Sequence, residues 1–395
     1  MGWSIERIEV LLLIAAIVAM IADRLRFPYT VGLVFAGVAL TFTHYAPDLS
    51  ITKDLIFRLF LPPLIFEAAF AISWKELRLN LPPVLLLATV GVVLAAGLTM
   101  LGMHYLVGWD WAAAALFGAL IAATDPVSVI AVFKESSVTG RLRLLVESES
   151  LLNDGTAAVL FSVVLAVVQG GALSITGIAL SLLWTIFGGI ACGLLIGGAA
   201  LLLSRGTKDP LVEITVTTVA AYGSFLLAEH YHLSGVISTL STGLLLGNVG
   251  AHGSLSKGGE EAVASFWEYA AFVVNSLVFL LIGIREARER FLGVALPLVI
   301  AILLVTLSRA VTVYPLCAVF ARTENRIEMP FQHILFWGGL RGALALALVL
   351  GLPADFPGRS EITTVAFGVV AFSIVVQGMT MPPLLRRLGL LVKSA

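Results

Sequence analysis

Two aspartates and several neutral oxygen-bearing side chains occur in the middle of strongly apolar segments. Asp125 follows Thr124 in one segment, and Ser150, Asn153 and Asp154 lie close together in the next. Ser150 and Asp154 are four residues apart, so they share one face if the segment is helical. Hard cations prefer oxygen ligands, and a carboxylate can bind a cation or a proton. The cluster therefore predicts a site where a cation and a proton compete, with Asp154 as the carrier.

Further charged side chains lie inside apolar segments, where an ionised group costs at least about 2.5–3.5 kcal/mol and needs a partner or a function. We expect Glu149 and Arg309 to form a buried, structural ion pair, because either charge alone would be costly. Arg341 is expected to compensate the negative C-terminal ends of interrupted helices, and Asp125 their positive N-terminal ends. For Asp125, cation coordination stays equally open. Glu67 is expected to be a direct ligand or a hydrogen-bond partner at the site.

The expected helices place both aspartates near the middle of a membrane. At the helical rise per residue, Asp125 lies about 12 Å from the end of its segment and Asp154 about 16 Å from the start of the next. A membrane is required because hydrophobic residues make up 59% and charged residues 12% of the 395 residues, with a mean hydropathy of +1.01. So few charges cannot cover a water-soluble surface. The net charge of −1 gives no indication of a nucleic-acid partner, and we expect no cofactor.

Thirteen apolar segments are long enough, or nearly so, to cross a membrane as helices. The sequence thus predicts an all-α, polytopic membrane protein. The predicted segments run over residues 8–22, 28–43, 54–73, 82–106, 112–133, 143–169, 177–204, 210–229, 233–248, 264–284, 291–320, 330–352 and 361–385.

The fifth and twelfth of these segments carry features that interrupt a helix. In the fifth, Pro126 removes a backbone donor and disfavours helical geometry in the residue before it. The twelfth contains the glycine-rich run Gly338–Gly342. Because the two segments are an odd number of crossings apart, their chain directions are opposite. This pattern predicts two inverted six-helix repeats, separated by segment 177–204, whose discontinuous helices cross at the midplane.

Basic residues indicate the orientation of the chain. With the N-terminus outside, most lysines and arginines fall in loops on the cytoplasmic side, as the positive-inside rule requires. We therefore expect a multi-pass protein of the cell (inner) membrane, with the N-terminus outside and the C-terminus in the cytoplasm. Only residues 388–395 follow Arg387, so no soluble C-terminal domain is expected.

Three glycines in segment 177–204, Gly189, Gly193 and Gly197, recur at four-residue spacing. This spacing lets two helices approach closely. We favour close packing within one subunit, and a dimer contact is the alternative.

Short motifs follow one another in order along nearly the whole chain. They are LPPLIFEA (61–68), ATDPV (123–127), ESLLNDG (149–155), FWE (266–268) followed by NS (275–276), SR (308–309) and GGLRG (338–342). Together they resemble the motifs of the sodium/proton exchangers of the NhaP type, the prokaryotic side of the cation/proton antiporter group.

The resemblance implies a secondary antiporter, not an enzyme, that exchanges Na⁺, and also Li⁺, for protons by alternating access. It implies the NhaA/NhaP-like antiporter fold and a homodimer surrounded by membrane lipid. The core domain would comprise residues 82–169 and 291–385 with part of 54–73, and the dimerisation helices residues 8–43 and 177–284.

By matching position, the resemblance also implies roles for the polar residues described above. Asp154 would be the principal carrier of the cation and the proton. Asn153 would fix the geometry, and Asp125 would line or support the site. The implied Na⁺ ligands are Asp154, Ser150, Glu67 and Thr124.

The neighbouring residues Asn153 and Asp154 bear on the stoichiometry. Relatives with two aspartates here, and a lysine in place of Arg309, are commonly electrogenic. If Glu149 and Arg309 neutralise each other, one titratable carboxylate does the exchange. We therefore expect one proton per cation and electroneutral transport.

Two alternatives stay open from the sequence. The same ligand types suit potassium, so a K⁺(Na⁺)/H⁺ antiporter of the same family would differ only in cavity size and rigidity. From a different class, Asp125 and Asp154 could activate water in an intramembrane aspartyl protease. The protease interpretation gives Arg309 and Arg341 no role.

Overall fold

The structure is a computed structural model, and it describes residues 5–25, 27–43, 54–135, 138–170, 175–250, 255–287, 289 and 291–390. Within these ranges every regular element is a helix, which confirms the predicted all-α class. Seven of the described helical stretches are long and apolar enough to cross a membrane. Shorter apolar helices are Tyr29–Leu40, Trp111–Ile121 and Gly235–Val249.

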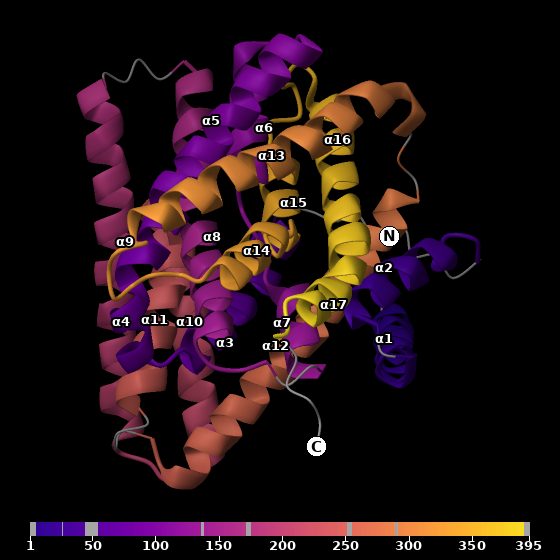
Figure 1. Cartoon of the computed structure of the whole chain (residues 1–395). Coiled ribbons are helices and arrows are strands. Elements are labelled where there is room, and N and C mark those ends of the chain that lie inside the picture. The colour runs from indigo at the N-terminus through magenta and orange to yellow at the C-terminus, as the bar shows by residue number, and fades with distance from the viewer. Residues whose placement is uncertain are drawn as a thin grey trace. The chain divides into compact units, whose positions relative to one another are not determined.

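The chain divides into two compact units, and its helices are coloured along the sequence in Figure 1. The first unit comprises residues 1–53, 82–153 and 275–395, and the second residues 54–81 and 154–274. Helices within the first unit are α1 (Ile5–Leu25), α2 (Tyr29–Leu40), η2 (Leu87–Gly91), α5 (Val92–Gly102), η3 (Met103–Val107), α6 (Trp111–Ile121), α7 (Val127–Glu135), η5 (Phe291–Val294), α13 (Ala295–Val319), α14 (Met329–Trp337), α15 (Ala343–Leu350), α16 (Arg359–Phe372), η6 (Ser373–Gln377) and α17 (Gly378–Arg387). Helices within the second unit are η1 (Leu55–Phe60), α3 (Leu61–Ala71), α9 (Ile175–Ser204), α10 (Pro210–His230) and α11 (Gly235–Val249). Helices that contain residues of both units are α4 (Trp74–Leu86), α8 (Arg141–Val168) and α12 (Lys257–Glu286).

Each predicted apolar segment coincides with a helix or an interrupted helix, although several helices extend further than the apolar pattern. α4 begins at Trp74, before the expected start at residue 82, and continues through Pro82 and Pro83. α12 begins at Lys257 rather than at residue 264. In both helices the additional first turns are polar, so the apolar pattern could not include them.

Both predicted helix interruptions occur in the first unit, and they contact each other. The backbone leaves helical geometry between α6 and α7 at residues 122–126, and between α14 and α15 at residues 338–342. The N–H of Asp125 donates to the carbonyl of Leu340 at 2.7 Å. We call residues 122–126 and 338–342 together the crossing, because the two interruptions meet there.

An apolar cluster of the first unit packs beside the crossing. It joins side chains of α4, η2, α7, α8, α13, α14 and α17 to Leu340 of the crossing. Phe133, Leu145 and Val313 are fully buried in it. Packing in this apolar cluster holds short helices such as α7 and α14 in place, although neither helix would be stable alone in water.

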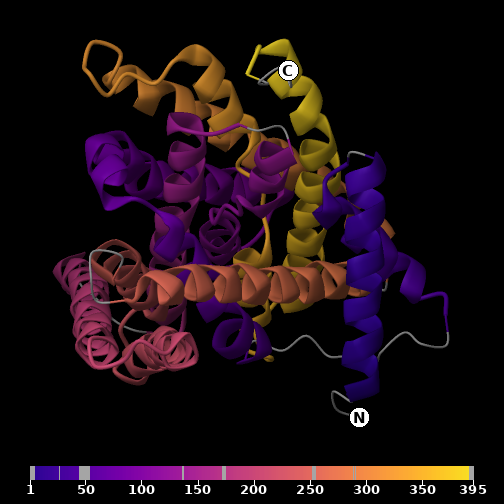
Figure 2. The same ribbon diagram turned by 90° about the horizontal axis from the view of Figure 1, so that it is seen from below.

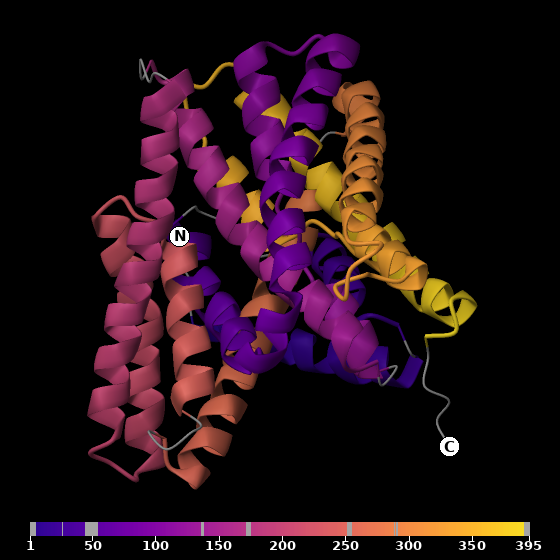
Figure 3. The same ribbon diagram turned by 60° about the vertical axis from the view of Figure 1, so that its left-hand side comes forward.

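The second unit is built around two long helices, α9 and α10, and the shorter α11, which lie side by side in Figure 3 and are seen nearly along their axes in Figure 2. A Cβ atom at Gly193 would overlap the carbonyl oxygen of Ser238 on α11, and one at Gly189 would lie 3.0 Å from the carbonyl oxygen of Ser234. Thr242 donates its hydroxyl to the carbonyl of Gly193 at 2.9 Å. The regularly spaced glycines therefore serve close packing inside one subunit.

Candidate functional site

Asp125 lies in the crossing and caps two half-helices at once. Its Oδ1 accepts the N–H of Val127, the first residue of α7, at 2.9 Å. The carboxylate also accepts the N–H of Ala343, the first residue of α15. A negative charge is favourable at a helix N-terminus, where backbone N–H groups lack partners. Gly342 makes this approach possible, because a Cβ atom there would overlap the Asp125 carboxylate.

Arg341 supplies the opposite charge in the crossing. Its Nη1 donates to the carbonyl of Ala123 at 2.9 Å, just beyond the C-terminal end of α6. Its backbone N–H donates to the hydroxyl of Ser373 at 3.0 Å. Arg341 is 2% exposed, so its charge is held inside the protein. A buried cation at a helix C-terminus compensates the carbonyl groups that the helix leaves unpaired.

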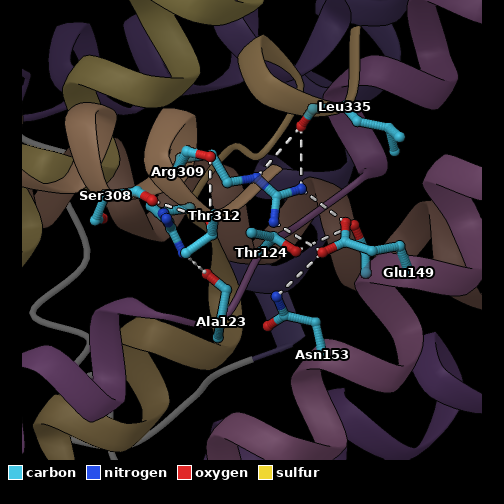
Figure 4. A network of polar contacts seen from close by, with 10 residues as sticks. Ala123, Thr124, Glu149, Asn153, Ser308, Arg309, Thr312 and Leu335 are labelled. Atoms are coloured by element: carbon cyan, nitrogen blue, oxygen red, sulfur yellow. Dashed lines mark hydrogen bonds and ion pairs between the residues drawn. The ribbon is translucent and has the colours of Figure 1, made fainter. Parts of the chain in front are cut away.

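Glu149 on α8 and Arg309 on α13 are in bidentate contact, as Figure 4 shows. Both nitrogen–oxygen distances are 2.8 Å, and the two residues are 2% and 7% exposed. Arg309 also donates from Nε and Nη2 to the carbonyl of Leu335, at 3.3 and 3.0 Å. Leu335 lies in the last turn of α14, so one guanidinium neutralises Glu149 and caps a half-helix.

Gly339 of the crossing allows the Arg309 side chain to approach α14. A Cβ atom at Gly339 would lie 2.6 Å from Nε of Arg309. The glycines of the motif at 338–342 thus make space for side chains from two other segments. Gly339 admits Arg309, and Gly342 admits Asp125.

Three neutral polar residues lie where the crossing meets α8: Thr124 in the crossing, and Ser150 and Asn153 on α8. The hydroxyl of Thr124 donates to that of Ser150 at 3.2 Å. Nδ2 of Asn153 donates to Glu149 at 3.4 Å, so the asparagine contacts the ion pair (Figure 4). All three are 1% exposed. Oδ1 of Asn153 is buried and accepts no hydrogen bond from the described part of the chain.

Asp154 and Glu67 belong to the second unit. Asp154 lies on α8, one helical turn after Ser150, and is half-buried. Glu67 lies on α3 and is half-buried as well. The two carboxylates of the implied Na⁺ ligand set are thus partly accessible, whereas the ion pair is enclosed.

Two hydrogen-bond partners of the buried arginines, Ser373 for Arg341 and the carbonyl of Leu335 for Arg309, were not predicted from the sequence. Ser373 begins η6, a π-helical turn after α16, and its hydroxyl also donates to the carbonyl of Arg341 at 3.2 Å. A serine and a glutamine inside the apolar segment 361–385 are the signal that could have indicated it. The carbonyl of Leu335 has no sequence signal, because every residue carries one.

Comparison with known proteins now identifies the family. The family model described as sodium/hydrogen exchanger, transmembrane, matches residues 10–387. The chain belongs to the sodium/hydrogen exchanger family. This confirms the family that the motifs predicted and the transporter class, and it removes the aspartyl protease alternative.

Curated relatives of this exchanger-family chain are similar over most of its length. The Na⁺/H⁺ antiporter ApNhaP of Aphanothece halophytica is 40% identical over 93% of this chain and 70% of the relative. The low-affinity Na⁺/H⁺ antiporter NhaS1 of a Synechocystis species is 36% identical over 99% of this chain and 76% of the relative's length. The Na⁺/H⁺ antiporter NhaG of Bacillus atrophaeus is 38% identical over 95% and 74%.

A solved structure has the same fold. The sodium proton antiporter MjNhaP1 of Methanocaldococcus jannaschii at pH 8 superimposes with a TM-score of 0.76 at 19% sequence identity, over 97% of this chain and 98% of the other. This chain is therefore an all-helical, multi-span membrane protein with the fold of that antiporter.

Proposed function

We propose that this chain exchanges Na⁺ for H⁺ across a cell membrane, with the cation and the proton binding in turn to Asp154. Membership of the exchanger family and the activity named for its curated relatives support the exchange. The chemistry of the oxygen cluster supports the carrier, because one carboxylate can hold either ion but not both.

Sodium is held by Asp154, Ser150, Glu67 and Thr124 in this proposal. The contact between the hydroxyls of Thr124 and Ser150 supports their membership of one ligand set. Asn153 sets the geometry through its contact with Glu149. Asp125 accepts N–H groups from two half-helices, which favours a supporting role in the crossing over direct coordination.

Transport is electroneutral in this proposal, with one proton for one sodium ion. The single observation that carries this is the bidentate contact between Glu149 and Arg309. Two charges that neutralise each other in a buried site add nothing to the charge that moves. Asp154 alone then changes its occupant, from a proton to a cation of equal charge.

The proposed architecture is that of two inverted six-helix repeats in a homodimer with its N-terminus outside the cell. A core of residues 82–169 and 291–385, with part of 54–73, would move relative to dimerisation helices within 8–43 and 177–284. The contact between two interrupted helices of opposite direction supports the repeats. Charge bias of the loops supports the orientation.

The first test measures proton flux in proteoliposomes with a preset pH gradient, a clamped membrane potential, and wild type beside Asp154→Asn. We expect sodium or lithium to dissipate the gradient in the wild type, whatever the potential, and Asp154→Asn to show only the rate of empty liposomes. Glu147→Gln is the matched control, because Glu147 is a carboxylate of the same helix that pairs with Arg143 at 2.7 Å. Flux that persists in Asp154→Asn contradicts the carrier assignment, and flux that follows the clamped potential contradicts electroneutrality.

Potassium selectivity is the second candidate, because the same oxygen ligands suit both ions. Adding potassium, and then choline, to the same liposomes distinguishes sodium selectivity from potassium selectivity. If potassium matches sodium, the family assignment and the carrier stand and only the cation changes.

A further inference from the structure

The C-terminal end of α12, in the first unit, carries a buried carboxylate that the proposed exchange does not use. Glu286 is 7% exposed, and both of its carboxylate oxygens are buried. Neither oxygen has a hydrogen-bond partner within the ranges that the structure describes. An ionised carboxylate in such a place is very costly, whereas a protonated one is neutral.

Among the described residues, the charged groups next to Glu286 along the chain are Arg285 and Glu289, and these two are already engaged with each other. Nε of Arg285 pairs with Oε1 of Glu289 at 2.8 Å, and its guanidinium lies 5.8 Å from the centre of the Phe367 ring. Oε2 of Glu289 accepts the hydroxyl of Thr364 at 2.7 Å. The charge of Arg285 is thus compensated by Glu289, and Glu289 repels a second negative charge nearby.

The elements packed against this end of α12 bring few other charges. α16 carries Arg359 and Glu361, of which Arg359 donates to the carbonyl of Leu350 at 3.4 Å and Glu361 accepts the indole N–H of Trp109 at 3.0 Å. α2 packs closely against α12 through glycine, and neither α2 nor residues 291–308 contain an acidic or basic side chain.

α1 packs on α2 and brings Arg7 and Glu9 near its start. Nη1 of Arg7 is also buried without a partner in the described ranges, and no ion pair joins Arg7 to Glu286 there. Among the described side chains, Arg285 attracts an ionised Glu286, but it is already paired with Glu289, and no ion pair to Glu286 is formed there.

We propose that Glu286 is a second proton-binding site, separate from the transport carboxylate, that holds a proton as a neutral carboxylic acid at neutral pH. Loss of this proton places a second negative charge beside Glu289. The ionised Glu286 then competes with Glu289 for Arg285. Alkaline pH thus loosens the ion pair between Arg285 and Glu289, which holds Glu289 in place for its hydrogen bond to Thr364 of α16. α16 leads through η6 to Ser373, which bonds the backbone of Arg341 in the crossing. This inference does not depend on the proposed exchange.

The test is infrared difference spectroscopy of the purified protein as the pH is stepped from mildly acidic to alkaline. All variants carry Asp154→Asn, so that the transport carboxyl gives no signal. We expect a carbonyl-stretch band of a protonated carboxylic acid that disappears at alkaline pH, is retained with Glu289→Gln, and is missing with Glu286→Gln. A band that survives Glu286→Gln, or no band in any variant, overturns the proposal. Loss of the band on adding sodium at constant acidic pH also overturns it, because the occupant is then a metal cation.

Melting temperatures give an independent measurement and a folding control. Glutamine is isosteric with the neutral acid, so Glu286→Gln should have the same melting temperature as the parent protein at acidic pH. The parent should lose melting temperature as the pH rises, because its folded form retains a proton that the unfolded form releases, and Glu286→Gln should lack that part of the decline. Equal declines in both proteins contradict the proposal.

Discussion

The crossing of the first unit and the contact between α9 and α11 in the second both depend on glycine, but for different reasons. In the crossing, Gly339 and Gly342 make room for the charged side chains of Arg309 and Asp125. On α9, Gly193 makes room for the backbone of α11. A glycine beside an interrupted helix thus admits a charge that caps the interruption, whereas a glycine in a continuous helix brings two backbones together.

The two regions also differ in how their backbone polar groups are satisfied. The crossing exposes the unpaired ends of four half-helices inside the protein, and charged side chains satisfy them. The helices α9 and α11 are continuous at their contact, so their backbone groups are satisfied internally and hydroxyls such as Thr242 suffice. Changes in the crossing should therefore affect both stability and exchange, whereas changes between α9 and α11 should affect stability alone.

Arg309→Leu should have the largest effect. It leaves Glu149 buried without its counter-charge and the carbonyl of Leu335 without a donor, and should lower the free energy of unfolding by about 3–5 kcal/mol. Unfolding in mixed micelles measures the loss. The double variant Glu149→Leu with Arg309→Leu removes both charges and should regain much of the stability, so equal losses in the single and double variants would contradict the ion-pair explanation.

Gly342→Ala should come next, because it forces the Asp125 carboxylate away from the N-termini of α7 and α15. Overpacking costs about 1–3 kcal/mol, and a misplaced site lowers the exchange rate by about tenfold or more. Sodium-driven proton flux in liposomes measures the second effect. Gly378→Ala is the control, because its Cβ atom would make an ordinary contact of 3.4 Å with Val31; an equal loss of flux in the control would refute the specific role of Gly342.

Gly193→Ala should destabilise the second unit while the exchange per folded protein is retained. A Cβ atom there overlaps the carbonyl of Ser238, and the expected cost is again about 1–3 kcal/mol. Gly198→Ala on the same helix is the matched control, since nothing lies within 4 Å of its Cβ position. The melting temperature should fall only for Gly193→Ala, and a specific loss of exchange there would remove the contrast between the two regions.

Ser373→Ala should have the smallest effect. It removes the hydrogen bond that the hydroxyl accepts from the backbone N–H of Arg341, worth about 1 kcal/mol, together with the longer one that it donates to the carbonyl of Arg341 at 3.2 Å. We also expect a several-fold lower exchange rate, because Arg341 is held less firmly. Ser162→Ala is the control, as its hydroxyl only donates to Ala158 within α8 at 2.9 Å. Identical exchange rates in the two variants would argue against a positioning role for Ser373.

Much of the fold and part of the site could be predicted from local chemistry. Pro126 and the glycines at 338–342 disrupt helical geometry wherever they occur, so the two interruptions were placed correctly. A buried charge requires compensation in any fold, and Glu149 and Arg309 are in contact. The starts of α4 and α12 were placed too late, because polar first turns carry no apolar pattern.

The sequence by itself determined that the chain is helical, that it spans a membrane and that charges in its interior must find partners. These properties follow from hydropathy, backbone geometry and the cost of burying a charge, which act on each residue locally. Only the tertiary structure decided that Arg309 caps α14 at Leu335, that Asp125 serves two half-helices, and that Ser373 bonds the backbone of Arg341. Each of these contacts joins segments distant in sequence through backbone groups that every residue carries, so no residue type reveals the partner before the helices have packed.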